Sequence, residues 1–319
     1  MKKSVTVFAP ATVANISCGF DIMGFALKGA GDVVTVSVSD GPAGDEIILK
    51  GRYAGSVPAG RSRNSAGASA DAMLAALGRK EMNIQITLEK NLPVGSGMGS
   101  SAAGAAASVY ALNSLLGSPF DTKELIPFAM EGERAACGTA HADNVAPSLL
   151  GGFVLIRSYD PLDIITVKIP EGIQCVVIHP HIEVKTSDAR RVLRKDFPLS
   201  TVTRQSANTA ALMTGLLTGD FDLVGRSMND LLAEPRRTQL IPGFHSAKKA
   251  ALEAGAIGCG ISGSGPSVFA LCTGNVSSEA VGSAMQKAFL AAGLSSDLII
   301  SPLMAPGASL INAEINDIQ

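Results

Sequence analysis

Two long stretches of this 319-residue chain contain no Asp, Glu, Lys or Arg, and they constrain the fold more than any other feature. They cover residues 91–120 and 254–278, and both are rich in glycine, serine and alanine. Neither predicts a membrane span, because a span needs about 20 predominantly apolar residues and Gly, Ser, Asn or Pro interrupt both stretches. Glycine lets a backbone approach a ligand closely, so both stretches are candidates for loops around a binding site.

The overall composition excludes several classes of protein. Hydrophobic residues make up 46% of the chain and charged residues 17%, which indicates a packed protein rather than a disordered one. The net charge of −2 predicts no broad basic surface for nucleic acid. The five cysteines form no CxxC motif and are typical of reduced thiols. We therefore expect a cytoplasmic protein with neither a nucleic-acid nor a membrane partner.

Hydrophobic periodicity indicates strands and helices that come in groups, which favours an α+β fold. Strands are expected over residues 4–8, 33–38, 46–49, 83–89, 152–157, 174–178, 258–261, 267–272, 297–302 and 309–313. Helices are expected over residues 64–77, 100–116, 122–136, 188–195, 201–217, 221–232, 243–254 and 278–292. A proline-containing segment at 158–170 predicts a junction between two domains, residues 1–165 and 166–319.

The first charge-free stretch begins with the sequence NLPVGSGMGSSAAG between an expected strand and an expected helix. Its glycines expose backbone N–H groups, and Ser100 lies where the helix should start. A helix N-terminus has unpaired N–H donors and a partial positive charge, so it attracts phosphate. No Walker A lysine motif occurs in the chain. The alternative interpretation is a tight strand-to-helix turn with serine caps.

The longer string PVGSGMGSSAAG resembles the phosphate loop of the GHMP kinases, the superfamily of galactokinase, homoserine kinase, mevalonate kinase and phosphomevalonate kinase. The segments PATVANISCGFDIMG at 10–24, HADNVAPSLLGG at 141–152 and EPRRTQLIPGF at 234–244 are similar to those of homoserine kinases in particular. GISGSGPSVFAL at 260–271 resembles the third motif of the superfamily. Ile16, Ser17 and Cys18 depart from the family pattern, whereas Asn15 and Asp21 keep it.

The resemblance implies a two-domain α+β architecture with the active site between an N-terminal ribosomal-S5-like domain and a C-terminal α/β sandwich. It also implies ATP-dependent phosphorylation of L-homoserine to O-phospho-L-homoserine in threonine biosynthesis, with Mg²⁺ and in a homodimer. Two alternatives are a kinase for another small alcohol, such as mevalonate or a sugar, and a non-catalytic nucleotide- or amino-acid-binding module. Arg190 and Arg237 favour an amino acid, because a sugar has no carboxylate for these two arginines to bind.

For the nucleotide, the resemblance assigns ATP binding to Asn64, Pro93, Val94, Gly95, Ser96, Gly97, Met98, Gly99, Ser100, Ser101, Ala102 and Ala103. A plain helix N-cap is the alternative for Asn64. The resemblance assigns Mg²⁺ binding to Ser100 and Glu133, and hard oxygen ligands suit this cation. Glu131 is a rival, but Glu133 has the family spacing of eight residues before His141.

An amino-acid substrate needs oxygens for its ammonium group and cations for its carboxylate. Asn15 and Asp21 suit the ammonium group, and Arg190 and Arg237 suit the carboxylate, because a guanidinium binds it in a bidentate manner. The resemblance adds further substrate-binding positions at His141, Asn144, Thr186 and Gly263. The alternatives are a solvated helix face for the basic cluster around Arg190 and a structural histidine at 141.

Asp143 and Asn144 are the candidates for a role at the acceptor hydroxyl. The resemblance selects Asn144, and an amide cannot take a proton at neutral pH. We therefore expect phosphoryl transfer without a strong protein base, with Asn144 orienting the hydroxyl. The string GCGISG at 258–263 formally matches a dinucleotide fingerprint, but a helix precedes it and a strand follows, so we reject that interpretation.

Overall fold

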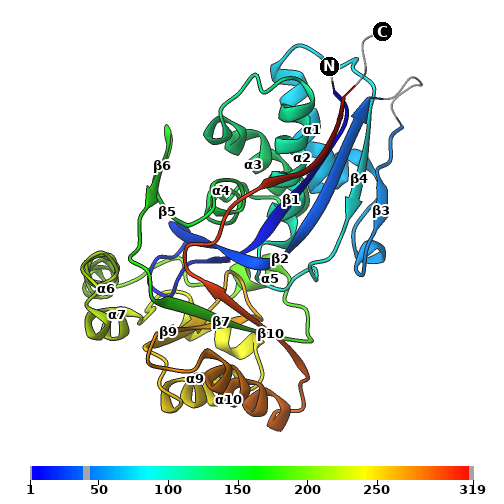
Figure 1. Cartoon of the computed structure of the whole chain (residues 1–319). Coiled ribbons are helices and arrows are strands. Elements are labelled where there is room, and N and C mark those ends of the chain that lie inside the picture. Colours follow the sequence, from blue (N-terminus) through cyan, green and yellow to red (C-terminus); the bar gives the residue numbers. More distant parts are fainter. Residues whose placement is uncertain (1, 39–43, 316–319) are drawn as a thin grey trace.

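The chain forms two β-sheets with helices packed against them (Figure 1). This architecture is seen in a computed structural model that describes residues 2–38 and 44–315. The strands are β1 (Lys2–Ala14), β2 (Met23–Val38), β3 (Ile48–Lys50), β4 (Ile84–Glu89), β5 (Phe153–Tyr159), β6 (Leu162–Val167), β7 (Ile173–Pro180), β8 (Gly258–Ile261), β9 (Val268–Thr273), β10 (Ser296–Pro302) and β11 (Ser309–Ile315). The α+β prediction is therefore confirmed.

The first sheet has the strand order β11-β1-β2-β4-β3, and β5 and β6 extend it from β2. Strands β1 and β2 are much longer than predicted. Residues 9–14 of β1 are buried throughout, so they lack the alternation that marks a strand with one wet face. Strand β6 lies within the segment that was predicted to be a domain junction, and it forms an antiparallel pair with β5.

Helices α1 (Ser65–Ala76), α2 (Ser100–Leu115), α3 (Ile126–Cys137) and α4 (Ala142–Leu150) cover one face of the first sheet (Figure 1). Helix α2 is nearly all Ala, Ser and Gly at its start and is buried almost all round. Small side chains let α1, α3, α4 and the sheet approach α2 closely.

The helices predicted at 64–77, 100–116 and 122–136 are confirmed to within a few residues.

Helix α4 was not predicted, because Pro147 lies inside it. A proline has no N–H to donate to the carbonyl four residues earlier, which here belongs to Asp143. That carbonyl points at Gly24 of β2, where an added Cβ would lie 1.9 Å from the oxygen. The glycine thus makes room for a carbonyl that the helix cannot pair, and it keeps α4 close to the sheet.

The second sheet has the strand order β10-β7-β9-β8, and all its pairs are antiparallel. Its helices are α5 (Thr186–Arg191), α6 (Leu199–Thr218), α7 (Phe221–Ser227), α8 (Glu234–Arg237), α9 (Phe244–Glu253) and α10 (Ser278–Ala291). The helix predicted at 188–195 is shorter and starts earlier. The one predicted at 221–232 ends at Ser227, and α8 was missed because it has a single turn.

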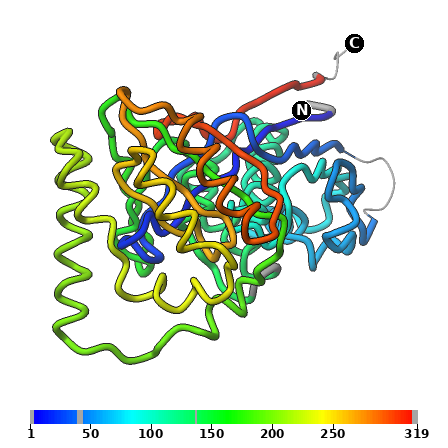
Figure 2. The backbone as a smooth tube through the Cα atoms, turned by 90° about the horizontal axis from the view of Figure 1, so that it is seen from below, coloured from blue at the N-terminus to red at the C-terminus, as the bar shows by residue number. Residues whose placement is uncertain are grey.

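Three clusters of buried apolar residues hold the molecule together. One lies between the first sheet and helices α1–α4, and one lies between the second sheet and helices α9 and α10. The third joins the two sheets through residues such as Phe25, Phe153 and Phe269. Helix α6 runs along one side of the molecule (Figure 2). No helix within residues 2–38 and 44–315 is long and apolar enough to span a membrane.

The chain returns to the first sheet at its end. After β10 of the second sheet, β11 pairs in an antiparallel manner with β1, so the first and last strands lie side by side (Figures 1 and 2). Residues from both ends of the sequence therefore complete one sheet, and the second sheet lies between them in the chain.

Candidate active site

A cavity of about 430 Å³ lies where the two halves of the chain meet. Every residue that was predicted to bind the substrate or the metal lines it, namely Asn15, Asp21, Ser100, Glu133, His141, Asn144, Thr186, Arg190, Arg237 and Gly263. The predicted nucleotide residues that line it are Asn64, Val94, Gly95, Ser96, Gly97, Gly99, Ser100 and Ser101. Pro93, Met98, Ala102 and Ala103 do not line it, and the last three are buried in the core.

The loop before α2 needs its glycines for two reasons. Gly95, Gly97 and Gly99 have φ values of 64°, 75° and 65°, in the left-handed region that favours glycine. A Cβ on Gly97 would lie 2.4 Å from the carbonyl oxygen of Ser262, and one on Gly99 would lie 2.1 Å from Oγ1 of Thr12. The hydroxyl of Ser262 also donates to the carbonyl of Gly97 at 2.7 Å. The two charge-free stretches of the sequence therefore pack against each other.

Helix α2 starts directly after this loop, and its N-cap Gly99 supplies no side chain to cap it. Gly99, Ser100 and Ser101 at this helix start line the cavity, and an uncapped helix N-terminus at a cavity suits a phosphate group. Asn64 has a different position. Its side chain caps α1 through the N–H of Ala66 and donates to the carbonyl of Pro58 at 2.8 Å, so both ends of its amide have protein partners.

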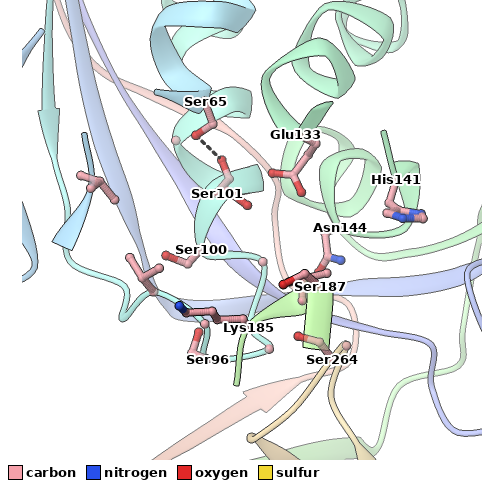
Figure 3. A pocket seen from close by; sticks show the side chains of 18 of the residues that line it. Ser65, Ser96, Ser100, Ser101, Glu133, His141, Asn144, Lys185, Ser187 and Ser264 are labelled. Atoms are coloured by element: carbon pink, nitrogen blue, oxygen red, sulfur yellow. Dashed lines mark hydrogen bonds between the residues drawn. The ribbon is translucent and has the colours of Figure 1, made fainter. Parts of the chain in front are cut away.

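Glu133 of α3 reaches the start of α2 (Figure 3). Glu133 as a residue is 7% exposed, and its Oε1 atom is buried without a hydrogen-bond partner. Burial raises the pKa of Glu133 to about 7, and a hydrogen bond with the side chain of Ser101 and the charge of Lys90 oppose this shift. The hydroxyl of Ser100 instead donates to the carbonyl of Leu92 at 3.2 Å. Glu133 therefore contacts the second serine of the loop rather than the first.

A buried ion pair that the sequence did not reveal supports the glycine loop before α2. Lys90 donates to the carboxylate of Asp32 and, at 2.7 Å, to the carbonyl of Ser100. Oδ1 of Asp32 also accepts hydrogen bonds from the backbone N–H groups of Asn91 and Leu92. Burial lowers the pKa of Lys90, and the Asp32 carboxylate opposes this shift. The pair fixes the path of the chain into the phosphate loop.

Asn144 lies near the start of α4 and is held by its neighbours. Its Oδ1 accepts a hydrogen bond of 2.7 Å from the hydroxyl of Thr12, a fully buried residue of β1. Its Nδ2 lies 3.4 Å from Oδ1 of Asp143. Burial, followed by the charge of Asp21, raises the pKa of Asp143 to about 7. The Asn144 amide therefore has a defined orientation beside the phosphate loop.

The side chains expected to hold the ammonium group and the carboxylate of an amino acid meet in the same cavity. Arg190 of α5 donates to both carboxylate oxygens of Asp21, at 2.8 and 2.6 Å, and lies 2.9 Å from Nε2 of His141. Asn15 accepts from the backbone N–H of Asp21 and donates to the carbonyl of Gly263. Burial and the charge of Arg190 lower the pKa of His141, which favours its neutral form.

Arg237 of α8 lies beside this group and is almost fully buried. It donates to the carbonyl of Gly263 at 2.7 Å and to that of Ala189 at 3.3 Å. Burial, followed by the charge of Arg190, lowers the pKa of Arg237 to about 10. The cavity thus contains both two guanidinium groups and the uncharged glycine loop.

Sequence reasoning missed several residues that line the cavity. Lys185 and Ser187 at the start of α5 and Ser264 in the loop after β8 reach into the cavity (Figure 3). Ser187 and Ser264 lie next to residues that were singled out, Thr186 and Gly263, so adjacency could have found them. Lys185 is one basic residue among several in its segment, and its sequence context gives no reason to choose it.

Comparisons with known proteins agree with this geometry. The family described as "GHMP kinases N terminal domain" matches residues 64–152, and "GHMP kinases C terminal" matches residues 212–291. A homoserine kinase of Chlorobaculum tepidum is 50% identical over 97% of this chain and 99% of its own length. One of Chlorobium phaeobacteroides is 48% identical over 97% of this chain and 100% of its own length.

A solved structure gives the same result for the fold. The crystal structure of homoserine kinase from Cytophaga hutchinsonii has a TM-score of 0.93 and 50% sequence identity, and the match covers 98% of each chain. The similarity thus extends over the motifs, both sheets and the cavity between them. The chain belongs to the homoserine kinases, a family within the GHMP kinases.

Proposed function

We propose that this protein transfers the γ-phosphoryl group of ATP to the side-chain hydroxyl of L-homoserine and forms O-phospho-L-homoserine. One observation carries the proposal: a single cavity is lined both by the glycine loop with the uncapped start of α2 and by an acidic group beside two guanidiniums. Phosphoryl transfer requires mainly the positioning of two reactants and stabilisation of charge, and this arrangement supplies both. The product would serve threonine biosynthesis.

At the nucleotide end, Gly95–Gly99 and the start of α2 would bind the ATP phosphates through backbone N–H groups. The loop has no charged side chain of its own. A carboxylate in it would repel phosphate, so the absence of acidic residues supports this role. Lys90 is tied to Asp32 and to a backbone carbonyl, so it would act by fixing the loop rather than by contacting phosphate.

Glu133 fits a Mg²⁺ ligand because one of its carboxylate oxygens is buried without a partner. A buried anion without a partner is costly, and a hard cation would satisfy it. Ser100 would be the second ligand and would have to release the carbonyl of Leu92. When bound, Mg²⁺ neutralises charge on the phosphate oxygens during transfer.

At the acceptor end, Asp21 and Asn15 would hold the substrate ammonium group, while Arg190 and Arg237 would hold its carboxylate. His141, Thr186 and Gly263 would complete the pocket. Asp21 and Arg190 form an ion pair with each other. The ammonium group of a zwitterion could replace Arg190 as the partner of Asp21, and its carboxylate could replace Asp21 as the partner of Arg190. A neutral sugar carries neither, so this end of the cavity favours an amino acid.

We further propose a homodimer in the cytoplasm and a domain boundary near residue 165, where β6 of the first sheet ends at Val167. The two matched family regions, 64–152 and 212–291, lie on either side of that residue and support it. Strand β11 belongs to the first sheet, so the N-terminal domain would also include the last strand of the chain.

The test is a coupled assay of ADP release with homoserine, mevalonate and galactose. We expect turnover with homoserine alone, loss of turnover with EDTA and recovery with added Mg²⁺. Turnover with mevalonate or galactose would support another small-alcohol kinase. Binding of ATP and homoserine without turnover would support a non-catalytic binding module.

Asn144→Ala should lower kcat with homoserine about 10- to 100-fold, because the acceptor hydroxyl would lose the group that orients it. Steady-state kinetics with saturating ATP measures the effect. Unchanged kcat and KM would contradict the orienting role. Asp143→Asn is the matched comparison, because Asp143 is the nearest carboxyl group. If it loses more activity than Asn144→Ala and the loss depends on pH, Asp143 is the proton acceptor instead.

A further inference from the structure

The two arginines of the substrate pocket share one aromatic ring. The Cζ atoms of Arg190 and Arg237 lie 5.1 and 5.2 Å from the centroid of the Phe20 ring. Phe20 is half-buried and is not among the described residues that line the cavity. It therefore contacts the guanidinium groups without forming part of the cavity wall.

Two guanidinium groups in one small site repel each other, and burial increases the effect of that repulsion. Burial first, and then the charge of Arg190, lowers the pKa of Arg237. The face of an aromatic ring carries partial negative charge and attracts cations within about 6 Å of its centre. One ring in contact with both groups offsets part of their repulsion without adding a carboxylate, which would compete with the substrate.

The other partners of the two arginines leave such a role open. Arg237 is fixed by two backbone carbonyls. Arg190 is fixed mainly by Asp21, and its Nε is buried without a hydrogen-bond partner. An amino-acid substrate would compete with both sides of the Asp21–Arg190 pair. Both arginine Cζ atoms lie over the Phe20 ring, which accepts no N–H hydrogen bond from them in the structure, so the ring does not take the place of a carboxylate partner.

We propose that Phe20 is a positioning residue whose ring holds the guanidinium groups of Arg190 and Arg237 in place for the substrate carboxylate. The ring belongs to the first half of the chain, and the arginines belong to α5 and α8 of the second half. Phe20 thus fixes the position of the two arginine side chains relative to the residues of the first half that line the acceptor site. This inference rests on the proposed roles of the two arginines.

The test compares two ligands that differ only in the carboxylate. Homoserine has it, and 3-aminopropan-1-ol lacks it while keeping the amine and the hydroxyl. We expect Phe20→Leu to raise the KM for homoserine roughly five- to thirty-fold, with a smaller change in kcat. The inhibition constant of 3-aminopropan-1-ol, measured by competition with homoserine, should change less than about twofold, because no carboxylate is present to sense the arginines.

Further variants separate the ring from its volume. Phe20→Tyr should retain the KM of the original protein, and Phe20→Met, which fills similar space without a ring, should behave like Phe20→Leu. Phe221→Leu is the matched control, because Phe221 is equally half-buried and does not line the cavity. It should leave both constants unchanged. Thermal unfolding checks that each variant is folded. If Phe20→Leu does not fold, Phe20→Met replaces it in the comparison of the two ligands.

The outcomes distinguish this inference from the function on which it rests. An equal loss of affinity for both ligands, or no loss for homoserine, would overturn the role of Phe20. If the unsubstituted protein binds both ligands equally well, the assignment of the arginines to a carboxylate fails and the inference fails with it. Turnover of homoserine with strong discrimination against 3-aminopropan-1-ol supports the assignment whatever Phe20 does.

Discussion

Replacing Glu133 with glutamine should abolish most of the activity and at the same time stabilise the free protein. Glu133→Gln keeps the size of the side chain but removes its negative charge. If the carboxylate binds Mg²⁺ beside the phosphate loop, kcat should fall about 100- to 1,000-fold, because charge on the phosphate oxygens would be less well neutralised. Steady-state kinetics over a range of free Mg²⁺ concentrations measures the loss.

The gain in stability follows from the raised pKa of Glu133. A glutamate in an unfolded chain has a pKa of about 4.3, whereas burial raises that of Glu133 to about 7. The folded protein therefore binds this proton more tightly than the unfolded chain does. The associated stability is full below about pH 4 and is lost as the pH rises through about 7. At pH 8 the charged group costs about 3 kcal/mol.

Glutamine is neutral at every pH, but its amide still has a polar atom to satisfy in a buried place. We expect Glu133→Gln to raise the free energy of unfolding at pH 8 by about 1–3 kcal/mol, and to have almost no effect near pH 4. Denaturant unfolding at both pH values measures this. Some decline with pH should remain in the variant, because burial raises the pKa of Asp143 as well.

Glu131→Gln is the control for this experiment. Glu131 lies on the same helix, is exposed and pairs with Arg134 at 3.1 Å. Its replacement should change neither kcat nor unfolding noticeably, because exposed ion pairs contribute little. Full activity in Glu133→Gln would refute the metal role. Lower stability of that variant at pH 8 would refute the account of a costly buried charge.

Gly97→Ala should damage the glycine loop before α2 severely. The new Cβ would meet the carbonyl oxygens of Ser262 and Gly265 at 2.4 and 2.7 Å, and the residue would also have to adopt a φ of 75°. Left-handed backbone costs a non-glycine residue about 1–2 kcal/mol, and overpacking typically costs about 1–3 kcal/mol. We expect the free energy of unfolding to fall by about 2–5 kcal/mol and the KM for ATP to rise, because the loop must move away from the second charge-free stretch.

Gly117→Ala separates the two causes. Gly117 lies in the same charge-free stretch, has a φ of 88°, and a Cβ on it would meet nothing within 4 Å. It therefore shares the backbone penalty without the clash, and we expect a loss of about 1–2 kcal/mol with no change in the KM for ATP. Equal losses in the two variants, measured by denaturant unfolding, would show that the contact with Ser262 and Gly265 has no part in the stability of the loop.

The sequence predicted the parts of the site that are encoded by local motifs. The glycines of the phosphate loop, Asn144 and the arginines at 190 and 237 lie in short segments with a recognisable pattern, and the fold brings all of them to one cavity. The strands and helices with one apolar face were predicted for a similar reason. Where β1 is buried on both faces, the pattern disappears and only part of the strand was recognised.

Contacts between distant segments could not be predicted in this way. The pairing of Lys90 with Asp32 and the hydrogen bond of Thr12 to Asn144 join residues far apart in the sequence. Phe20 is an ordinary apolar residue until the fold brings two arginines to it. The resemblance assigned Ser100 and Glu133 to one Mg²⁺ ion, and in the structure the side chain of Ser101 is the one hydrogen-bonded to Glu133. One residue along a helix turns a side chain by about 100°.

The return of the chain to the first sheet has a mechanical consequence. The chain crosses between the sheets once before β7 and once after β10, and the N–H of Leu303 donates to the carbonyl of Ile173, so the two crossings are bonded to each other. The second crossing is also bonded to Leu149 and Gly152, at the end of the helix that carries Asn144. Two connecting segments side by side resist twisting of one half of the chain against the other more than a single segment does. The backbone hydrogen bonds of the second crossing therefore connect the helix that carries Asn144 directly to the segment that joins the two halves.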